Sequence, residues 1–261
     1  MLRLIVLTSV MAFASTAVGQ PEDPVRPDEV IKLFSKDSLK GFDTWLKDSA
    51  RNDPKKVFSI QDGVLHVSGE GLGYLATVRP YRDYRLVGEF RWGKRTDGGK
   101  YVRNSGILLH AQGEHGSAGG VWMPSIECQL AQGCVGDLIP IPGKSQRVEF
   151  KSDVVFGPDK RPRWKKGGES KTFTGRQLWW SDHDPDFKEL LDTRGKNDVE
   201  SPLGEWTKIE IECRGKQIAV SVNGKQVNAA YDASPGAGRI LFQCEGFEID
   251  FRNFEIRPLK E

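Results

Sequence analysis

The sequence lacks several features that mark common protein classes. Beyond its first twenty residues it has no apolar run long enough to span a bilayer, and helical periodicity is nearly absent. Neither charge sign dominates, because 38 Lys and Arg residues stand against 36 Asp and Glu residues, a formal net charge of +2. Proteins that bind nucleic acid or anionic membranes usually carry a strongly basic face. The composition therefore argues against both partners and favours a neutral one.

Cysteine is also scarce, with Cys128, Cys134, Cys213 and Cys244 as the full set. No two of them have the C-x-x-C spacing of a structural zinc site. Cysteines of an exported protein can oxidise, so disulfides between Cys128 and Cys134 and between Cys213 and Cys244 are the preferred pairing. Four buried free thiols are an alternative of equal weight.

The first nineteen residues have the pattern of a secretory signal. Arg3 precedes a short apolar core, and Ala17 and Gly19 occupy the small-residue positions before a cleavage point. The mature protein is then expected to be periplasmic or secreted, with no membrane anchor. The predicted organisation is a signal peptide over residues 1–19, a Pro-rich leader over 20–29 and one domain over 30–261.

The rest of the chain alternates short apolar-polar segments with Gly, Asp and Asn clusters, which is typical of antiparallel β structure. Asn223-Gly224 is the strongest hairpin signal, and Asp62-Gly63 is a second. About eleven strands without crossover helices predict an all-β fold, two packed antiparallel sheets in a sandwich or jelly roll. Residues 143–201 are the least regular part and are predicted to be long loops.

Two strands place polar side chains at every second position. Residues two apart share a face of a strand, so "NSGILLHA" is predicted to present Asn104 and His110 together, and "SIECQL" to present Glu127 with Gln129. The apolar residues between them would form the core. Ordinary solvated positions on an outer sheet face are the alternative interpretation.

Further polar residues continue this row on the last two strands, where alternation places Gln243 in "GRILFQCEG" and Arg252 in "FEIDFRNFEI". Amide, guanidinium and carboxylate groups suit sugar hydroxyls, and the indoles of Trp122 and Trp180 could stack on a sugar ring. For each tryptophan a core position is the alternative, and for Arg252 an ion pair with a neighbouring carboxylate.

Several blocks in order resemble a known family. They are "NSGILLH", "WMPSIECQLAQGCVGDL", "GEWTKIEIECRG", "VNGKQVN" and "GRILFQCEGFEIDFRNFEI". Over about residues 30–259 the chain is similar to the 3-keto-disaccharide hydrolase domain (DUF1080), also described as the 3-keto-glucoside lyase and 3-keto-2-hydroxy-glucal hydratase domain. The resemblance implies a concanavalin A-like lectin/glucanase sandwich. The segments "KRPRWKKGGES" and "SDHDPDF" match no block of this family.

The resemblance also implies a sugar substrate whose glucose unit is oxidised at C3. The ketone acidifies the proton on C2, so a base can remove it, the glycosidic oxygen can leave C1, and water can add to the resulting glucal. Such a site needs a base of near-neutral pKa, an acid and donors for the enolate. Glu127 is the predicted base, His110 an alternative base or the acid, and Asp137 an assisting group.

The predicted ligands of the sugar or enolate are Asn104, Gln129, Gln243, Arg252, Trp122 and Trp180. No organic cofactor is expected, and a divalent ion at His110, Glu127 or Asp137 stays open. Two rival functions remain: a conventional two-carboxylate glycosidase, for which "SIECQL" offers one carboxylate, and a non-catalytic carbohydrate-binding module. The acidic loop "DHDPDF" has Phe187 where a calcium loop needs glycine, so it is interpreted as solvated.

Overall fold

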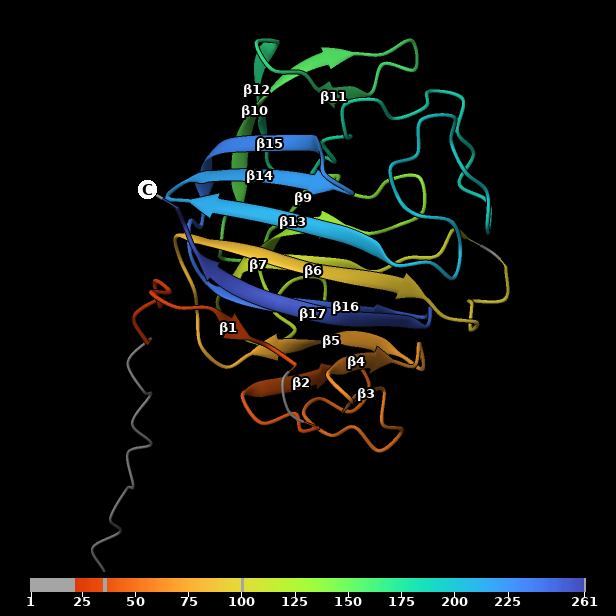
Figure 1. Ribbon diagram of the computed structural model, residues 1–261. Coiled ribbons are helices and arrows are strands. Elements are labelled where there is room, and N and C mark those ends of the chain that lie inside the picture. The colour runs from red at the N-terminus through yellow and green to blue at the C-terminus, as the bar shows by residue number, and fades with distance from the viewer. Residues whose placement is uncertain (1–21, 35–36, 100, 261) are drawn as a thin grey trace, which may run out of the picture.

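The computed structural model describes residues 22–34, 37–99 and 101–260. Two antiparallel sheets lie face to face, and the longest loops gather at one end of them, on the right of Figure 1. The predicted signal peptide, residues 1–19, lies outside the described residues. The later part of the predicted leader contacts the sandwich, because the amide of Val25 donates to the carbonyl of Pro80 at 2.9 Å.

The larger sheet has eleven strands. Its order is β11 (Pro162–Trp164), β10 (Glu149–Phe156), β15 (Lys225–Ser234), β14 (Gln217–Val222), β13 (Thr207–Arg214), β6 (Tyr84–Trp92), β17 (Ile249–Pro258), β4 (Val64–Val67) and β3 (Phe58–Gln61), with β1 (Ile31–Lys32) on β17 and β12 (Glu169–Phe173) on β10.

The smaller sheet has six strands. Its order is β2 (Phe42–Leu46), β5 (Leu72–Thr77), β16 (Arg239–Glu245), β7 (Gly106–Ala111), β8 (Ser125–Gln129) and β9 (Leu138–Ile141). The prediction of an all-β, two-sheet antiparallel sandwich is confirmed. Within the described ranges, no helix has the length and apolar character needed to cross a membrane.

The inner faces of both sheets meet in one apolar core. A group of phenylalanine rings spans the gap between the sheets: Phe242 of β16 lies 5.2 Å from Phe251 and 5.1 Å from Phe254, both of β17, between ring centroids. Phe34 contacts the same ring at 5.2 Å. Edge-to-face contacts of this kind are favourable beyond the area they bury. This cluster holds the smaller sheet, and therefore the candidate site, against the larger one.

Both predicted hairpins are present. Asn223 and Gly224 join β14 to β15 with φ angles of 48° and 83°, and Asp62 and Gly63 join β3 to β4 with 50° and 75°. Positive φ at both central residues is what a two-residue hairpin turn requires. These dipeptides therefore fix the register of two strand pairs.

Gly224→Ala should destabilise the protein by about 1–2 kcal/mol, because an L-residue pays that amount in the left-handed region. A Cβ at this position would meet no atom within 4 Å, so the backbone conformation alone sets the cost. Thermal unfolding should show a decrease of roughly 2–8 °C in a chain of this size. Gly175→Ala is the matched control, since Gly175 also has open space but lies outside the left-handed region. Equal changes in the two variants would contradict the explanation.

The region from 143 to 201 is more regular than predicted. The segment "GPDKRPRWKKGGESK" was predicted to be a loop, but it contains β11 and the first three residues of β12, and both strands pair with β10. These strands have only three and five residues and are rich in charge, so apolar alternation is too weak to show them. The remainder, from 174 to 201, forms the long loops that were expected.

The preferred disulfides between Cys128 and Cys134 and between Cys213 and Cys244 are wrong, and the alternative holds. All four cysteines are buried free thiols. Burial raises the pKa of each thiol. Since the thiolate is the reactive form, these side chains act as small core residues.

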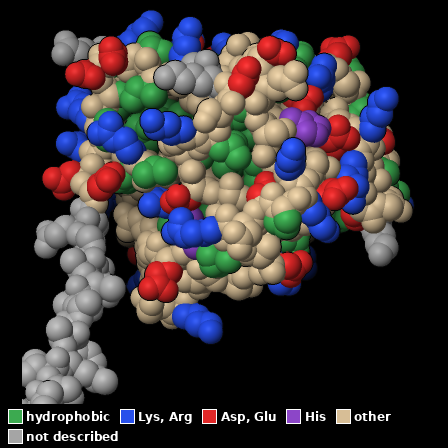
Figure 2. Space-filling model, turned by 90° about the horizontal axis from the view of Figure 1, so that it is seen from below, with side chains coloured by type: hydrophobic (Ala, Val, Ile, Leu, Met, Phe, Trp, Pro, Cys, Tyr) green, Lys and Arg blue, Asp and Glu red, His purple; other side chains and the backbone are tan. Residues whose placement is uncertain are grey.

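Acidic and basic side chains are interspersed over the face of the molecule shown in Figure 2. This distribution agrees with the near-neutral net charge of the sequence.

Candidate active site

The outer face of the smaller sheet carries a group of polar side chains from β8 and β16. Glu127 and Gln129 on β8 point away from the core, because Ile126 and Cys128, which alternate with them along the strand, lie in the core. Gln243 on β16 points the same way, and Phe242 and Cys244 beside it point inward. The predicted alternation of these strands is confirmed. Glu127 is only 6% exposed and Gln243 only 1%.

Gly106 lets two of these side chains meet. Gly106 lies on β7, the strand between β8 and β16. It pairs with Gln129 on β8, and its neighbour Ile107 pairs with Phe242, the residue before Gln243, on β16. A Cβ added at Gly106 would lie 2.3 Å from Oε1 of Glu127 and 2.4 Å from Oε1 of Gln243. The two oxygens thus share the space above the glycine. The Oε1 atom of Gln243 is buried there and has no hydrogen-bond partner among the described residues.

A second carboxyl group, Glu245, lies next to this pair. It follows Gln243 by two residues at the end of β16, so strand alternation places both on one face. The side-chain amide of Asn104 donates a hydrogen bond to the Glu245 carboxylate. Glu245 is partly exposed, whereas Glu127 is buried, so Glu245 is the more accessible of the two groups.

Burial and mutual repulsion shift the acidities of both groups. Burial, with the negative charge of Glu245 as a second cause, raises the pKa of Glu127 well above its usual range. Burial raises the pKa of Glu245 to about 7, although the hydrogen bond from Asn104 opposes this shift. Two neighbouring carboxyls that cannot both ionise easily share a proton. Near neutral pH the pair therefore contains one carboxylic acid and one carboxylate.

Sequence reasoning missed Glu245. The signal was available, since the alternation that selected Gln243 in "GRILFQCEG" continues to Glu245 at the next outward position. The structure brings together Glu127, Gln243 and Asn104 from the predicted set and adds this residue. Gln129 lies on the same face, where its Oε1 accepts from the amides of Leu130 and Ala131 at 3.0 and 3.2 Å.

Aromatic side chains cover the neighbouring part of the same face. Tyr74 on β5 lies beside Gln243 in register. Its hydroxyl is 2.8 Å from Nδ1 of His115, whose ring stacks between Tyr74 and Trp45 at centroid distances of 5.7 and 5.2 Å. Trp122 packs near Tyr74 at 6.2 Å. The predicted sugar-stacking residue Trp122 thus lies over the candidate face.

The predicted position of His110 beside Glu127 is wrong. A β-bulge puts Leu109 and His110 together opposite Ile240, and His110 has φ of 55°. The extra residue reverses the alternation, so the imidazole points inward to within 6.1 Å of the Tyr84 ring on the other sheet. Burial lowers the pKa of His110 to about 4. Its Nδ1 lies 3.1 Å from the carbonyl of Pro235.

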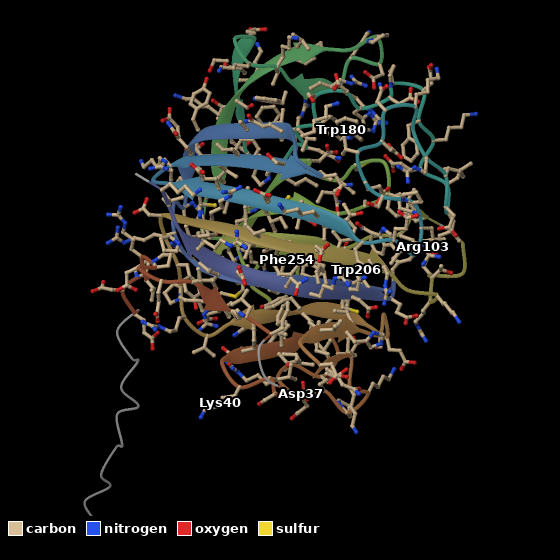
Figure 3. All side chains as sticks on the ribbon, in the orientation of Figure 1. Asp37, Lys40, Arg103, Trp180, Trp206 and Phe254 are labelled. Atoms are coloured by element: carbon tan, nitrogen blue, oxygen red, sulfur yellow. The ribbon has the colours of Figure 1, made fainter. Side chains whose placement is uncertain are left out.

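The Asp137 carboxylate and the Trp180 side chain do not contribute to the Glu127 group, although the Asp137 carbonyl accepts from the amide of Gln129 at 2.9 Å. The Asp137 carboxylate accepts from the side chain of Gln177 at 2.5 Å and from the amide of Trp180 at 2.6 Å. The Trp180 indole lies in the core and donates to the carbonyl of Gly133 at 2.9 Å. Figure 3 shows Trp180 above β14, near the long loops. Both residues fix the 177–180 segment to the sandwich.

Arg252 lies on the outer face of the larger sheet. Its guanidinium donates to Glu89 at 2.9 Å and covers the Trp206 ring at 3.9 Å; Figure 3 shows Trp206 in front of β6 and β17. The expectation that Arg252 joins the row of Glu127 is therefore wrong, because its guanidinium forms an ion pair with Glu89. Alternation along β17 correctly predicted that Arg252 points away from the core, but it cannot tell which of the two sheets contains the strand.

No group of three or more His, Cys, Asp or Glu side chains within the described ranges is arranged to hold a metal ion. The residues left open for a divalent ion, His110, Glu127 and Asp137, point to separate places. In the acidic loop, Asp184 accepts backbone amides from Asp186 and Lys196 at 3.0 and 3.1 Å.

Gly106→Ala should greatly reduce any turnover that depends on the Glu127 carboxyl group, while the sandwich stays folded. The added methyl group would force the Glu127 and Gln243 oxygens apart, since it would lie at less than 3 Å from both. The checks are steady-state turnover and the thermal unfolding midpoint, with Gly175→Ala as control. An active Gly106→Ala protein would show that the two side chains need not meet.

Comparisons with known proteins identify the family and the fold. A family model, the 3-keto-alpha-glucoside-1,2-lyase-like domain, matches residues 29–257. A search of curated proteins gives no match. Two crystal structures from Parabacteroides distasonis ATCC 8503, each provisionally named a glycosyl hydrolase, are similar in fold.

The first of these structures has a TM-score of 0.50 at 20% identity, covering 89% of this chain and 100% of that chain; the second has 0.51 at 17%, covering 89% and 94%. At these identities the likeness establishes the fold alone. The family match spans nearly the whole described sandwich. The two-sheet antiparallel sandwich is thus shared with these structures, and the chain belongs to the 3-keto-alpha-glucoside-1,2-lyase-like domain family.

Proposed function

We propose that this protein cleaves 3-keto-glycosides by removing the C2 proton, expelling the glycosidic oxygen and hydrating the product. The observation that carries the proposal is the pair Glu127 and Glu245, a buried and a partly exposed carboxyl of raised pKa on one sheet face. Together with Gln243 and Asn104 they supply a base, an acid and amide groups in one place. The family match supports a 3-keto sugar as substrate.

The two carboxyls take different roles because their surroundings differ. Glu245 is the more exposed member and has its pKa near 7, so it ionises before Glu127 and acts as base toward the C2 proton as the pH rises past 7. Glu127 is more deeply buried and keeps its proton, which it gives to the oxygen leaving C1. The sequence prediction of Glu127 as base thus changes to Glu127 as acid.

The bonds balance across the two steps. Loss of the C2 proton and the C1–O bond gives a C1=C2 double bond conjugated with the C3 ketone, and the aglycone leaves as an alcohol. Water then adds across that bond, with hydroxide at C1 and a proton at C2. Glu127, which is ionised after the first step, can accept the proton from this water. Glu245 is partly exposed, so its proton exchanges with solvent before it protonates C2. Asn104 and Gln243 orient the pair through their hydrogen bonds.

A conventional glycosidase is a second candidate, since the structure supplies the second carboxylate that the sequence seemed to lack. A carbohydrate-binding module is the third. Incubating the protein with 3-keto-trehalose, 3-keto-sucrose and the unoxidised parents, with and without chelator, separates all three. The proposal expects cleavage of the keto sugars alone and no effect of chelator. Cleavage of the parents alone would favour the glycosidase, and binding without cleavage would favour the module.

The turnover rate should depend on pH through the carboxyl pair. The base must be ionised, so kcat should rise with pH through an apparent pKa near 7 rather than near the usual value for glutamate of about 4.3. It should fall again when Glu127 loses its proton at higher pH. Initial rates between about pH 5 and pH 9 test this. A rate already maximal at pH 5 would contradict the proposed base.

We further propose that the protein acts outside the cytoplasm, without an organic cofactor, on a small neutral sugar. The signal-like segment over residues 1–19 supports export. Amino-terminal sequencing of the protein from its native host should show a chain that begins after Gly19. A mature chain that still begins at Met1 would contradict export.

A further inference from the structure

A basic segment that the proposed function does not use builds a groove of its own. Residues 160–176, "KRPRWKKGGESKTFTGR", contain seven Lys and Arg residues and one Glu. They form β11 and β12, which both pair with β10 of the larger sheet, at the top of Figure 1. Between these strands and residues 174–179 lies a groove of about 560 Å³. That volume suits a ligand of about two sugar rings.

The lining of this groove, which we call the basic groove, is cationic and has no carboxylate. Its cations are Lys160, Arg161, Lys171 and Arg176. Lys160 and Arg176 make no ion pair within the described part of the chain. Arg161 pairs with Asp159 at 3.8 Å, and Lys171 pairs with Glu169. Asp159 is mainly held by Arg163, which donates to both of its oxygens at 2.7 and 2.8 Å. The uncompensated positive charge of the basic groove is therefore that of Lys160 and Arg176.

Apolar and aromatic groups lie among these cations. The Phe156 side chain is 55% exposed at the end of β10, although an isolated phenylalanine gains from burial. Trp179 forms another wall, and the Arg161 guanidinium lies 4.3 Å above its ring. That contact holds Arg161 in place. A ring with an exposed face beside fixed cations can stack on a sugar while the cations bind its acidic substituents.

The wall of the basic groove is anchored from the sandwich. Gln177 lines the groove, and its side chain is held by the Asp137 carboxylate at 2.5 Å. The amide of Trp164 on β11 donates to the carbonyl of Trp179 at 2.9 Å. The groove thus has rigid walls from two segments. Its strands belong to the larger sheet, whereas Glu127 lies on the outer face of the smaller one.

We propose that the basic groove is a second carbohydrate site, which binds a sugar chain bearing carboxylate or sulfate groups. Charge complementarity requires an anion, and the exposed aromatic ring together with the volume favours a short run of sugar rings over a free inorganic ion. A nucleic acid strand is disfavoured because it would need a longer cationic track with several stacking rings. The site would hold the protein on an acidic polysaccharide while the carboxyl pair acts on a small sugar.

The test is titration calorimetry of the full protein at about 150 mM salt with alginate oligosaccharides, sulfated dextran oligosaccharides, neutral dextran and oligo-dT. At least one acidic glycan should bind, and neutral dextran should not. Lys160→Gln with Arg176→Gln should weaken that binding by about tenfold or more. Lys165→Gln with Lys166→Gln is the matched control, since both lysines are exposed on the same hairpin but do not line the groove. This pair should change the affinity by less than about twofold.

Phe156→Ala separates stacking from charge, because it should weaken glycan binding several-fold at every salt concentration. Glu127→Gln should leave glycan binding unchanged, so failure of the proposed catalysis and failure of this site are distinguishable. Equal losses in both lysine-arginine pairs, binding of oligo-dT as tight as that of the glycans, or no binding of either acidic glycan would overturn the proposal.

Discussion

Glu127→Gln is expected to lower kcat for a 3-keto-disaccharide by about 10²–10⁴-fold, and Glu245→Gln by a similar factor. Glutamine keeps the size of each side chain and its hydrogen bonding but can neither release nor accept the proton. The substrate should still bind, so KM should change by far less than kcat. The double variant should lose little more than either single one, because the two groups act as one unit.

Glu212→Gln is the control for both variants, because Glu212 lies on β13 of the larger sheet and pairs with Arg214 at 3.3 Å. It should keep full activity. Thermal unfolding should show that Glu127→Gln and Glu245→Gln are folded and no less stable, since each removes one of two neighbouring carboxyls that repel each other when both are ionised. If both Glu127→Gln and Glu245→Gln kept full activity, neither carboxyl group could be the catalytic acid or base.

Phe242→Ala should produce the largest loss of stability among single core changes, about 3–5 kcal/mol. Its ring is fully buried, and it contacts Phe34, Phe251 and Phe254 at 5.1–5.2 Å between centroids. Removing it opens a cavity between the sheets where the core is closely packed. In a chain of this length that corresponds to roughly 6–20 °C in the unfolding midpoint.

Two further variants make the Phe242→Ala experiment specific. Phe242→Leu should lose clearly less stability, because it leaves a smaller cavity. Leu203→Ala should change the free energy of unfolding by no more than about 0.5 kcal/mol, since the Leu203 side chain is 50% exposed. A Phe242→Ala loss no greater than that of Leu203→Ala would mean that the sheets do not depend on the phenylalanine cluster.

The sequence allowed the class of fold and the positions of many strands to be predicted, because those depend on local patterns. Asn223-Gly224 specifies a turn whatever surrounds it. Alternation placed Glu127 and Gln243 outward correctly, because each sits between residues that must enter the core. The same rule would have found Glu245, had it been followed one position further along β16.

What could not be predicted depends on contacts between distant segments. The β-bulge at His110 occurs where the register between β7 and β16 shifts by one residue. No pattern in the local sequence predicts this shift. Which sheet receives β17, and therefore Arg252, is a question of topology. Asp137 resembled a catalytic carboxylate in sequence, yet it binds the 177–180 segment, forty residues further along the chain.

Proton exchange at C2 of the substrate tests the proposed carboxyl pair most directly. In D₂O, cleavage of 3-keto-trehalose by the unchanged protein should give 3-keto-glucose with deuterium at C2, measured by NMR. Both Glu127→Gln and Glu245→Gln should reduce this product by at least about a hundredfold. Cleavage that leaves the original hydrogen at C2, or exchange at the normal rate in both variants, would contradict the assignment of these two residues as base and acid.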